Sequence, residues 1–291
     1  MLINNFKLNN KVKFHYIEHH LAHIASAFYP SNFKDANGLS IDGSGDFVSL
    51  AYAECKNNEI KIKKKEYFPN SLGIFYHAMT QFLGYERYGD EYKIMGLAAY
   101  GKPVYYEKIL EKLFKKDKNF YKLNLDFFEH HKKDFKYIAD ENFIIDQIFN
   151  SKVKEVFSNE IKEDNFKENF ASSVQKVYEY FFNKIIETIK NKKFSNNIVF
   201  SGGCALNSSA NRFLTNNKDF FNNVFINCAP GDNGGALGAA LIVAAKYKQN
   251  FENIKSPYLG KEFDNDYIKK ILIENYSNEK LIFNYIKSDE E

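Results

Sequence analysis

Tryptophan is absent from this chain of 291 residues, and cysteine, proline and arginine are scarce. The three cysteines, Cys55, Cys204 and Cys228, stand far apart without a CxxC pair, which argues against a disulfide framework. Residues 1–14 contain no apolar run typical of a signal peptide, and the longest mostly apolar stretch, 234–245, is too short to span a bilayer. These absences predict a cytoplasmic protein without a membrane partner.

An excess of charge of one sign is also missing. The chain has 40 basic and 37 acidic residues, a net charge of +3, and only Arg87 and Arg212 are arginines. Lysines are matched by carboxylates over most of the chain, which is typical of solvated surfaces and predicts no nucleic-acid partner. Hydrophobic residues make up 44% and charged residues 26%, as in globular proteins with one large domain or two ordinary ones.

Hydrophobic periodicity predicts an α/β fold. Three strands joined by short turns indicate an antiparallel meander, and a strand, a glycine turn and a helix occur twice after residue 197, which indicates a parallel sheet edge. We expect these strands in one mixed sheet or in the sheets of two adjoining lobes, with those near 198 and 225 paired. Strands are predicted at 12–16, 39–41, 47–54, 60–68, 197–200 and 224–226, helices at 18–28, 71–84, 91–99, 166–190, after 203 to 213, and 235–247, and helices and loops at 104–165.

Two histidines could hold a metal. His19 and His23 are spaced i and i+4 in the predicted helix 18–28, so their rings project from one face. Neutral imidazoles at that spacing suit transition metals, although such a pair is more often structural or exposed. His20 faces elsewhere and His15 precedes the helix, so neither is expected to be a ligand. The other histidines, among them His77, stand in no motif.

Three glycine turns that follow predicted strands are further candidate sites: 42–46, 201–203 and 230–235. Glycines let backbone amides approach a phosphate, and a strand-end aspartate such as Asp42 can hold a cation, although this turn alone is more often a plain hairpin. At 201–203 the amides can face a nucleotide, or the glycines can serve close strand–helix packing. Asp232 either points into a cleft or caps the following helix.

The order of these motifs resembles the O-carbamoyltransferase family. Five motifs follow that family's order, from about Lys13 to Gly260: HHLAHIASAFYPS, IDGSGD, GDEYKIMGLAAYG, SGGCALN and APGDNGGALGAA. The family includes nodulation-factor and antibiotic carbamoyltransferases. Its main domain resembles the tRNA threonylcarbamoyltransferase subunit of the actin/sugar-kinase/chaperone ATPase superfamily. The resemblance therefore implies an RNase H-like mixed sheet flanked by helices.

The resemblance also implies a division of the chemistry between two domains. A C-terminal domain, missing from this sequence, uses carbamoyl phosphate and ATP to form carbamoyl-adenylate. The domain seen here then passes the carbamoyl group to a hydroxyl of a small molecule or saccharide, and the sequence names neither the acceptor nor a catalytic base. A non-catalytic fragment that binds nucleotide or a partner chain is one alternative. A tRNA-modifying subunit is another, but HHLAH and GLAAYG favour the O-carbamoyl branch.

The same resemblance implies which residues hold the cofactors. A divalent metal, in that family of the iron type and therefore expected to be Fe(II), would polarise the carbamoyl carbonyl. Its implied ligands are His19, His23, Asp42 and Asp232. The residues implied to line ATP or carbamoyl-adenylate are Asp42, Gly43, Ser44, Gly45, Gly73, Gly202, Gly203 and Asn207.

Both ends of the chain depart from the family pattern, in which a longer segment with a GHD-type motif precedes the histidines. We therefore expect residues 1–38 to be a remnant of a first lobe that includes the histidine helix. Residues 39–255 are expected to form a nearly complete second lobe with a helical insertion at about 104–165. Residues 256–291 would be a linker and the start of the missing C-terminal domain. Such a truncated or split enzyme would expose apolar faces and need a complementing chain.

Overall fold

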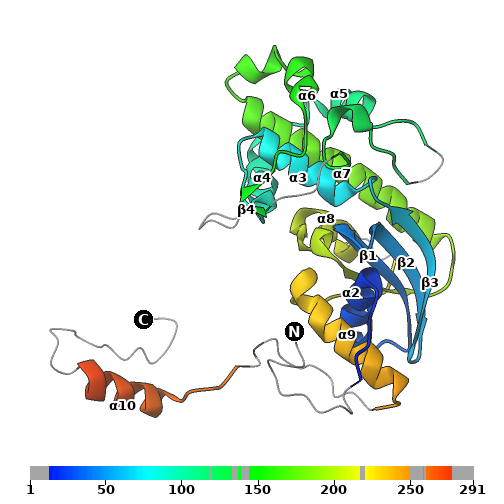
Figure 1. The fold of residues 1–291 in the computed structure, drawn as a ribbon, viewed down its shortest axis with the longest axis vertical. Helices are drawn as coiled ribbons and strands as arrows, with labels where there is room; N and C mark the ends of the chain where they lie inside the picture. The colour runs from blue at the N-terminus through cyan, green and yellow to red at the C-terminus, as the bar shows by residue number, and fades with distance from the viewer. Residues whose placement is uncertain are drawn as a thin grey trace. The chain divides into compact units, whose positions relative to one another are not determined.

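The computed structural model of the chain describes residues 13–117, 120–132, 137–138, 144–216, 220–249, 258 and 260–276 (Figure 1). The internal contacts divide the chain into two units, Met1–Asn253 and Ile254–Glu291. In the described part of the second unit, the helix α10 (Asn265–Tyr276) has no buried residue. The other helices and strands belong to the first unit.

A five-stranded mixed sheet forms the centre of the first unit. Its strands, in the spatial order β3-β2-β1-β6-β7, are β1 (Asp35–Gly45), β2 (Val48–Lys56), β3 (Glu59–Tyr67), β6 (Asn197–Ser201) and β7 (Asn223–Ile226). β1, β2 and β3 form an antiparallel meander, while β6 pairs in parallel with β1 and β7 in parallel with β6. The predicted α/β class, the meander and the pairing near 198 and 225 are confirmed.

Helices cover the sheet, and its two faces bury different hydrophobic clusters. The helix α2 (His19–Phe28) packs on one face, where Ile24 and Phe28 contact a cluster that includes Val199. The other face contributes Leu39 and Phe200 to a larger cluster with the helices α3 (Leu72–Phe82) and α7 (Phe166–Lys190). The predicted helix 166–190 is confirmed at both ends, because its apolar stripe faces this larger cluster.

The segment 104–165 extends the larger cluster rather than forming a separate core. Its aromatic side chains, Phe114, Phe149 and Phe157 among them, pack in the same cluster as α7. It contains helices, as predicted, and a two-stranded sheet that was not predicted, since two-residue strands are too short to show alternation. The helices and strands of this segment are α5 (Tyr106–Leu113), β4 (Tyr137–Ile138), β5 (Ile144–Ile145) and α6 (Ser151–Val156). Outside the segment, α4 (Glu91–Leu97) precedes it, α8 (Ser208–Asn216) follows β6, and α9 (Asp232–Lys246) follows β7.

The strand predicted at 12–16 is wrong for its described part, since residues 13–18 have no regular structure. Tyr16 is 97% exposed, and none of the described strands pairs with this segment. An alternating pattern produces a strand only where a neighbouring strand accepts and donates the backbone hydrogen bonds. Val12 lies outside the described residues.

The turn predicted at 42–46 lies further along the chain. β1 continues to Gly45, which pairs with Val48, and the two turn residues are Asp46 and Phe47, with φ of 50° and 61°. Two positive φ values in a two-residue hairpin belong to the type I′ turn that fits the twist of the flanking strands. The glycines before the turn thus remain in the strand, where Gly45 packs closely against the His19 ring and no atom lies within 4 Å of a Cβ built on Gly43.

Small residues let α9 lie directly against α2. A Cβ atom on Gly238 would stand 1.8 Å from the carbonyl oxygen of Ala22. The sequence predicted that these small residues would meet a sheet or a ligand, but their neighbour is a helix. α9 also begins at Asp232 instead of Gly235, so the aspartate occupies its first turn.

We predict that Gly238→Ala destabilises the protein, while Gly235→Ala does not. Both changes raise helix propensity equally, but only the new methyl at 238 would overlap a backbone oxygen, since no atom lies within 4 Å of a Cβ at 235. Overpacking of this kind costs about 1–3 kcal/mol. Denaturant unfolding of the two variants measures the difference, and equal midpoints would contradict the close helix contact.

Candidate metal centre and cavity

The N-terminus of α2 is held by a helix cap and by a hydrogen bond to the turn that follows β1. The Glu18 carboxylate caps the helix by accepting a hydrogen bond from the backbone N–H of Leu21 at 2.8 Å. The backbone N–H of His19 donates to the Asp46 carboxylate at 2.9 Å, in the turn that follows β1. These bonds hold the first turn of α2 beside the end of β1.

His20 fixes the rotation of the helix and is no candidate ligand, as the sequence predicted. It is fully buried, and its Nδ1 and Nε2 lie 2.9 Å from Ser40 Oγ and 2.8 Å from the carbonyl oxygen of Val48. Burial is the main influence and lowers the pKa of His20, so a neutral ring joins the two strands. With His20 turned into the sheet, His19 and His23 face the strand ends.

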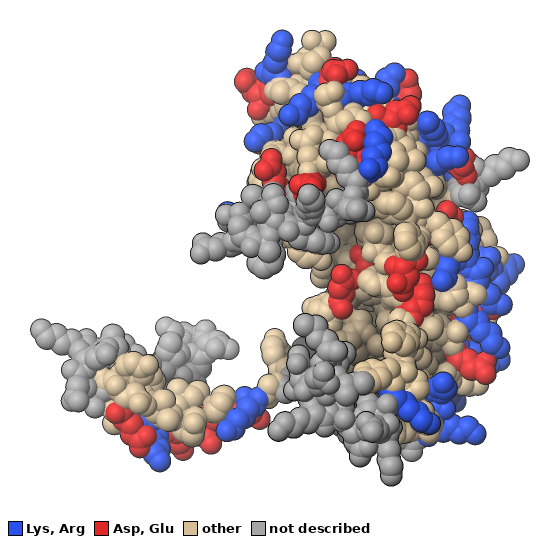
Figure 2. All heavy atoms as spheres, viewed as in Figure 1, with Lys and Arg blue, Asp and Glu red and all other residues tan. Residues whose placement is uncertain are grey.

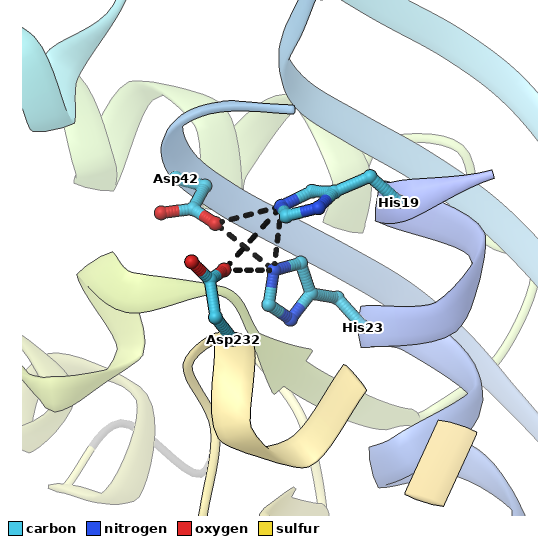
Figure 3. Close-up of side chains that lie close together, drawn as sticks. All are labelled: His19, His23, Asp42 and Asp232. Atoms are coloured by element: carbon cyan, nitrogen blue, oxygen red, sulfur yellow. Dashed lines mark hydrogen bonds and ion pairs between the residues drawn. The ribbon is translucent and has the colours of Figure 1, made fainter. Parts of the chain in front are cut away.

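The four residues implied as metal ligands lie together (Figure 3). The carboxylate of Asp42 stands 3.1 Å from His19 Nε2 and 2.9 Å from His23 Nε2. The carboxylate of Asp232 stands 3.5 Å and 3.4 Å from the same two atoms, and the two Nε2 atoms are 3.0 Å apart. Because β1, β6 and β7 are parallel, their carboxyl ends share one edge of the sheet, and this edge brings Asp42 and Asp232 together.

These separations fit a single first-row metal ion. Ligand atoms at bonds of about 2.1 Å are roughly 3.0 Å apart at right angles and roughly 3.4 Å apart in a tetrahedron. The donor–donor distances that involve a histidine nitrogen run from 2.9 to 3.5 Å, and all four donor atoms lie within 4.8 Å of one another. Two imidazole nitrogens and two carboxylate oxygens form a set that suits Fe(II), Mn(II) or Zn(II). The side chain of Asp232 is 64% exposed, so the centre is open on that side.

The electrostatics show that the site favours positive charge at its middle. Burial is the largest influence on the pKa of His23 and lowers it, but hydrogen bonds with Asp232 and Asp42 outweigh it and raise the pKa to about 9. Burial raises the pKa of Asp42, yet its hydrogen bonds with His19 and His23 prevail and hold the pKa well below its usual range. A proton on His23 thus offsets the negative charge of the two carboxylates. A metal cation could offset the same charge in its place.

Glycines leave the room that the centre needs. A Cβ atom on Gly45 would stand 2.1 Å from the His19 ring, and one on Gly203 would stand 2.8 Å from Asp42 Oδ1. Gly202 has φ of 88°, and a Cβ atom there would stand 2.3 Å from a backbone oxygen of β1. These glycines were predicted to line a nucleotide, which stays a prediction; in the structure Gly45 packs against the His19 ring and Gly202 against the backbone of β1.

A cavity of about 550 Å³ adjoins the centre, and Asp42 and Asp232 form part of its wall. In Figure 2, Asp and Glu side chains gather around the hollow in the middle of the first unit. Among the described lining residues there is no lysine or arginine. Six of the residues implied to line a nucleotide are in the wall: Asp42, Gly43, Ser44, Gly73, Gly203 and Asn207.

Aromatic side chains complete the cavity, and the sequence did not indicate them. Tyr76, Tyr88, Tyr92 and Tyr178 line it, coming from α3, from the loop before α4, from α4 and from α7. No local motif connects these positions, because packing of the helices brings them together. In a chain with 20 tyrosines, single tyrosines carry no recognisable signal.

Asn207 is held rigidly in the wall. Its side-chain amide pairs with that of Gln175 through two hydrogen bonds of 3.0 and 3.1 Å, and Tyr76 Oη donates to Gln175 at 2.8 Å. The Asn207 oxygen also accepts from the backbone N–H of Ala210 in the first turn of α8. The residue therefore links the cavity wall to both α7 and α8.

Most of the chain matches a known protein family. Residues 2–241 match the family model described as the carbamoyltransferase N-terminus. The chain belongs to the carbamoyltransferase family. This match confirms the family to which the order of the five motifs pointed.

Curated relatives extend beyond this chain. The chain is 35% identical over 264 residues to the uncharacterized protein sll1178 of Synechocystis sp., covering 88% of this chain and 41% of that protein. It is 28% identical over 254 residues to the nodulation protein NolNO of Sinorhizobium fredii (86% and 34% covered). It is 27% identical over 266 residues to NolO of Bradyrhizobium diazoefficiens (90% and 44% covered). The chain thus spans less than half the length of these relatives.

Among the described residues, no helix is both long enough and apolar enough to cross a bilayer.

We predict that the carbamoyltransferase chain binds about one equivalent of Fe(II), Mn(II) or Zn(II). The double variant His19→Ala, His23→Ala should lose the metal, because two of four donors are removed. Metal analysis after gel filtration measures the content. The matched control is His130→Gln, His131→Gln, a histidine pair remote in sequence from the centre, and metal retained equally in both double variants would contradict the assignment.

The raised pKa of His23 predicts opposite pH dependences with and without metal. In chelator, the charged His23 stabilises the fold fully below pH 6.5, and this contribution is lost as the pH rises to about 9. With metal, protons compete for the same nitrogen, so metal-linked stability grows over that range. The difference in unfolding free energy between wild type and His23→Gln should therefore shrink with pH in chelator and increase with pH in metal. Parallel slopes would speak against a shared metal and proton site.

Proposed function

We propose that this chain performs the transfer step of O-carbamoylation. It would move a carbamoyl group from carbamoyl-adenylate to a hydroxyl of a small molecule or saccharide. One observation carries the proposal: in a member of the carbamoyltransferase family, two residues of a four-donor cluster, Asp42 and Asp232, line a cavity of about 550 Å³. A cavity of this volume matches the size of typical small-molecule sites.

In this proposal His19, His23, Asp42 and Asp232 hold a divalent ion, for which we propose Fe(II). When bound, such an ion acts as a Lewis acid that polarises a carbonyl oxygen. The exposed side of Asp232 leaves space at the centre for an oxygen of the ligand. Two hydrogen bonds hold Asp42 in position: its Oδ1 accepts from the N–H of Gly43 at 2.7 Å, and its backbone oxygen accepts from Ser71 Oγ at 3.0 Å.

The chain's own residues would position the reactants and exclude water. Gly43, Gly73 and Gly203 leave backbone uncovered in the wall, where a phosphate of the adenylate can approach closely. The tyrosines on the other walls offer flat apolar surfaces to a nucleobase or a sugar ring. AMP is a good leaving group, so orientation of the acceptor hydroxyl against the carbamoyl carbon supplies much of the rate.

The donor must come from elsewhere in this scheme. We propose that ATP and carbamoyl phosphate are converted to carbamoyl-adenylate by a further domain or a complementing chain. The fact that this chain spans less than half of its relatives supports this view. The division into a first-lobe remnant (1–38), a second lobe (39–255) and a linker (256–291) stays a prediction.

The finer fold assignment is also a proposal. We propose an RNase H-like sheet of the actin/sugar-kinase/chaperone type. An antiparallel meander continued by two parallel strands, with helices on the faces, supports it.

We predict that the metal-loaded chain carbamoylates a hydroxyl acceptor when supplied with synthetic carbamoyl-adenylate. Amino sugars, oligosaccharides and nucleosides form a suitable panel, and mass spectrometry detects the product. Asp42→Asn, a substitution of nearly equal size, should lower the rate about 100-fold because it weakens charge stabilisation at the carbonyl. Asp126→Asn, at an exposed aspartate outside the cavity wall, is the control that should retain most activity. Nucleotide binding without any transfer would favour the alternative, a non-catalytic binding fragment.

A further inference from the structure

A histidine and a carboxylate form a second polar group in the cavity wall, apart from the metal centre. His77 on α3 and Glu91 on α4 both line the cavity, and His77 Nδ1 stands 2.5 Å from Glu91 Oε1. His77 is only 8% exposed, whereas the side chain of Glu91 is 36% exposed. Neither residue takes part in the centre described above.

The hydrogen bond defines the state of the His77 ring. A carboxylate accepts, so Nδ1 carries the hydrogen that it donates to Glu91. The opposite nitrogen, Nε2, is buried and has no hydrogen-bond partner among the described residues. A buried ring nitrogen without a partner is destabilising, and a bound ligand with a hydroxyl group could supply the missing hydrogen bond.

The helix geometry places His77 near the metal centre. A Cβ atom on Gly73 would stand 2.8 Å from the backbone oxygen of Asp42. The first turn of α3 therefore contacts β1 at one of the proposed metal ligands. His77 follows four residues later on the same helix face, about 6 Å along the axis. The imidazole and the cluster therefore lie along one wall of the same cavity.

The other titratable groups of the wall are poor proton acceptors. Burial raises the pKa of Tyr76, Tyr178 and Cys204, so they stay protonated near neutral pH. Asp42 and Asp232 belong to the metal centre. Among the described lining residues, His77 remains as the nitrogen base, with Glu91 as the group that orients it.

We infer that His77 is the general base that activates the acceptor hydroxyl, an assignment that rests on the proposed function. The hydroxyl oxygen bonds to the carbamoyl carbon of carbamoyl-adenylate, and the bond from that carbon to the phosphate oxygen breaks. The hydroxyl proton passes to His77 Nε2, and AMP leaves with the bonding electron pair. Glu91 keeps Nδ1 as the donor and stabilises the imidazolium that forms.

Kinetics of single variants test this assignment. His77→Gln should lower kcat about 100-fold or more, the usual effect of a lost general base, with the acceptor KM and the metal content nearly unchanged. The acid limb of the pH–rate profile should disappear with it, and free imidazole should partly rescue His77→Ala. Glu91→Gln should lower kcat less than His77→Gln. A kcat for His77→Gln within about threefold of wild type would overturn the assignment.

His130→Gln is the matched control, since His130 is buried and its Nε2 donates to the backbone oxygen of Pro69, outside the cavity wall. It should retain wild-type kcat.

A chemical probe separates this inference from the proposed function. Diethyl pyrocarbonate labels the unprotonated ring nitrogen of histidine, and peptide mass spectrometry locates the label. We expect labelling of His77 that slows in Glu91→Gln, because loss of the carboxylate removes the acceptor that keeps the hydrogen on Nδ1 and leaves Nε2 free. If wild type transfers no carbamoyl group, the proposed function fails, and labelling alone decides whether His77 is an available base. A His77 that stays unlabelled while His15 is labelled would overturn the inference in either case.

Discussion

The contact between α2 and α9 is the interaction on which the site depends. Because Gly238 has no side chain, α9 can lie against the backbone of α2 at Ala22, and its first turn reaches the histidines. A wider separation of the two helices would remove Asp232 from the cluster while leaving the sheet intact. The arrangement therefore joins a packing constraint, satisfied by small residues, to the geometry of a potential metal centre.

The centre also connects parts of the chain that are far apart in sequence. His19 and His23 come from α2, Asp42 from the end of β1, and Asp232 from the helix that follows β7. Without a cation, two carboxylates close together repel each other, and a proton on His23 is the group that balances them. If the proposed metal binds there, its binding free energy would hold three elements together and add to the stability of the fold. In that proposal chemistry and stability are coupled at this point of the molecule.

The cavity combines two kinds of wall. One is backbone-rich, lined by Gly43, Gly73 and Gly203, and in the proposed function it receives the phosphate of the donor. The other is aromatic, formed by tyrosines of α3, α4 and α7, and it suits a planar or ring-shaped ligand. The His77–Glu91 pair lies where α3 and α4 meet, so the proposed base faces the same space as both walls. Such a division fits the proposed transfer from a phosphorylated donor to an acceptor hydroxyl.

Elements with a local signal could be predicted from the sequence alone. The stripe of α7, the alternating strands of the meander and the i, i+4 pair His19 and His23 all follow from periodicity within one segment, and the ordered motifs determined the family. Features that depend on contact with another segment of the chain were evident only from the tertiary structure. It excluded a strand at 13–16, where no described strand pairs, and moved the turn after β1 to Asp46 and Phe47 so that Gly45 could face His19. It also paired His77 with Glu91, because side chains from two separate helices meet only when those helices pack.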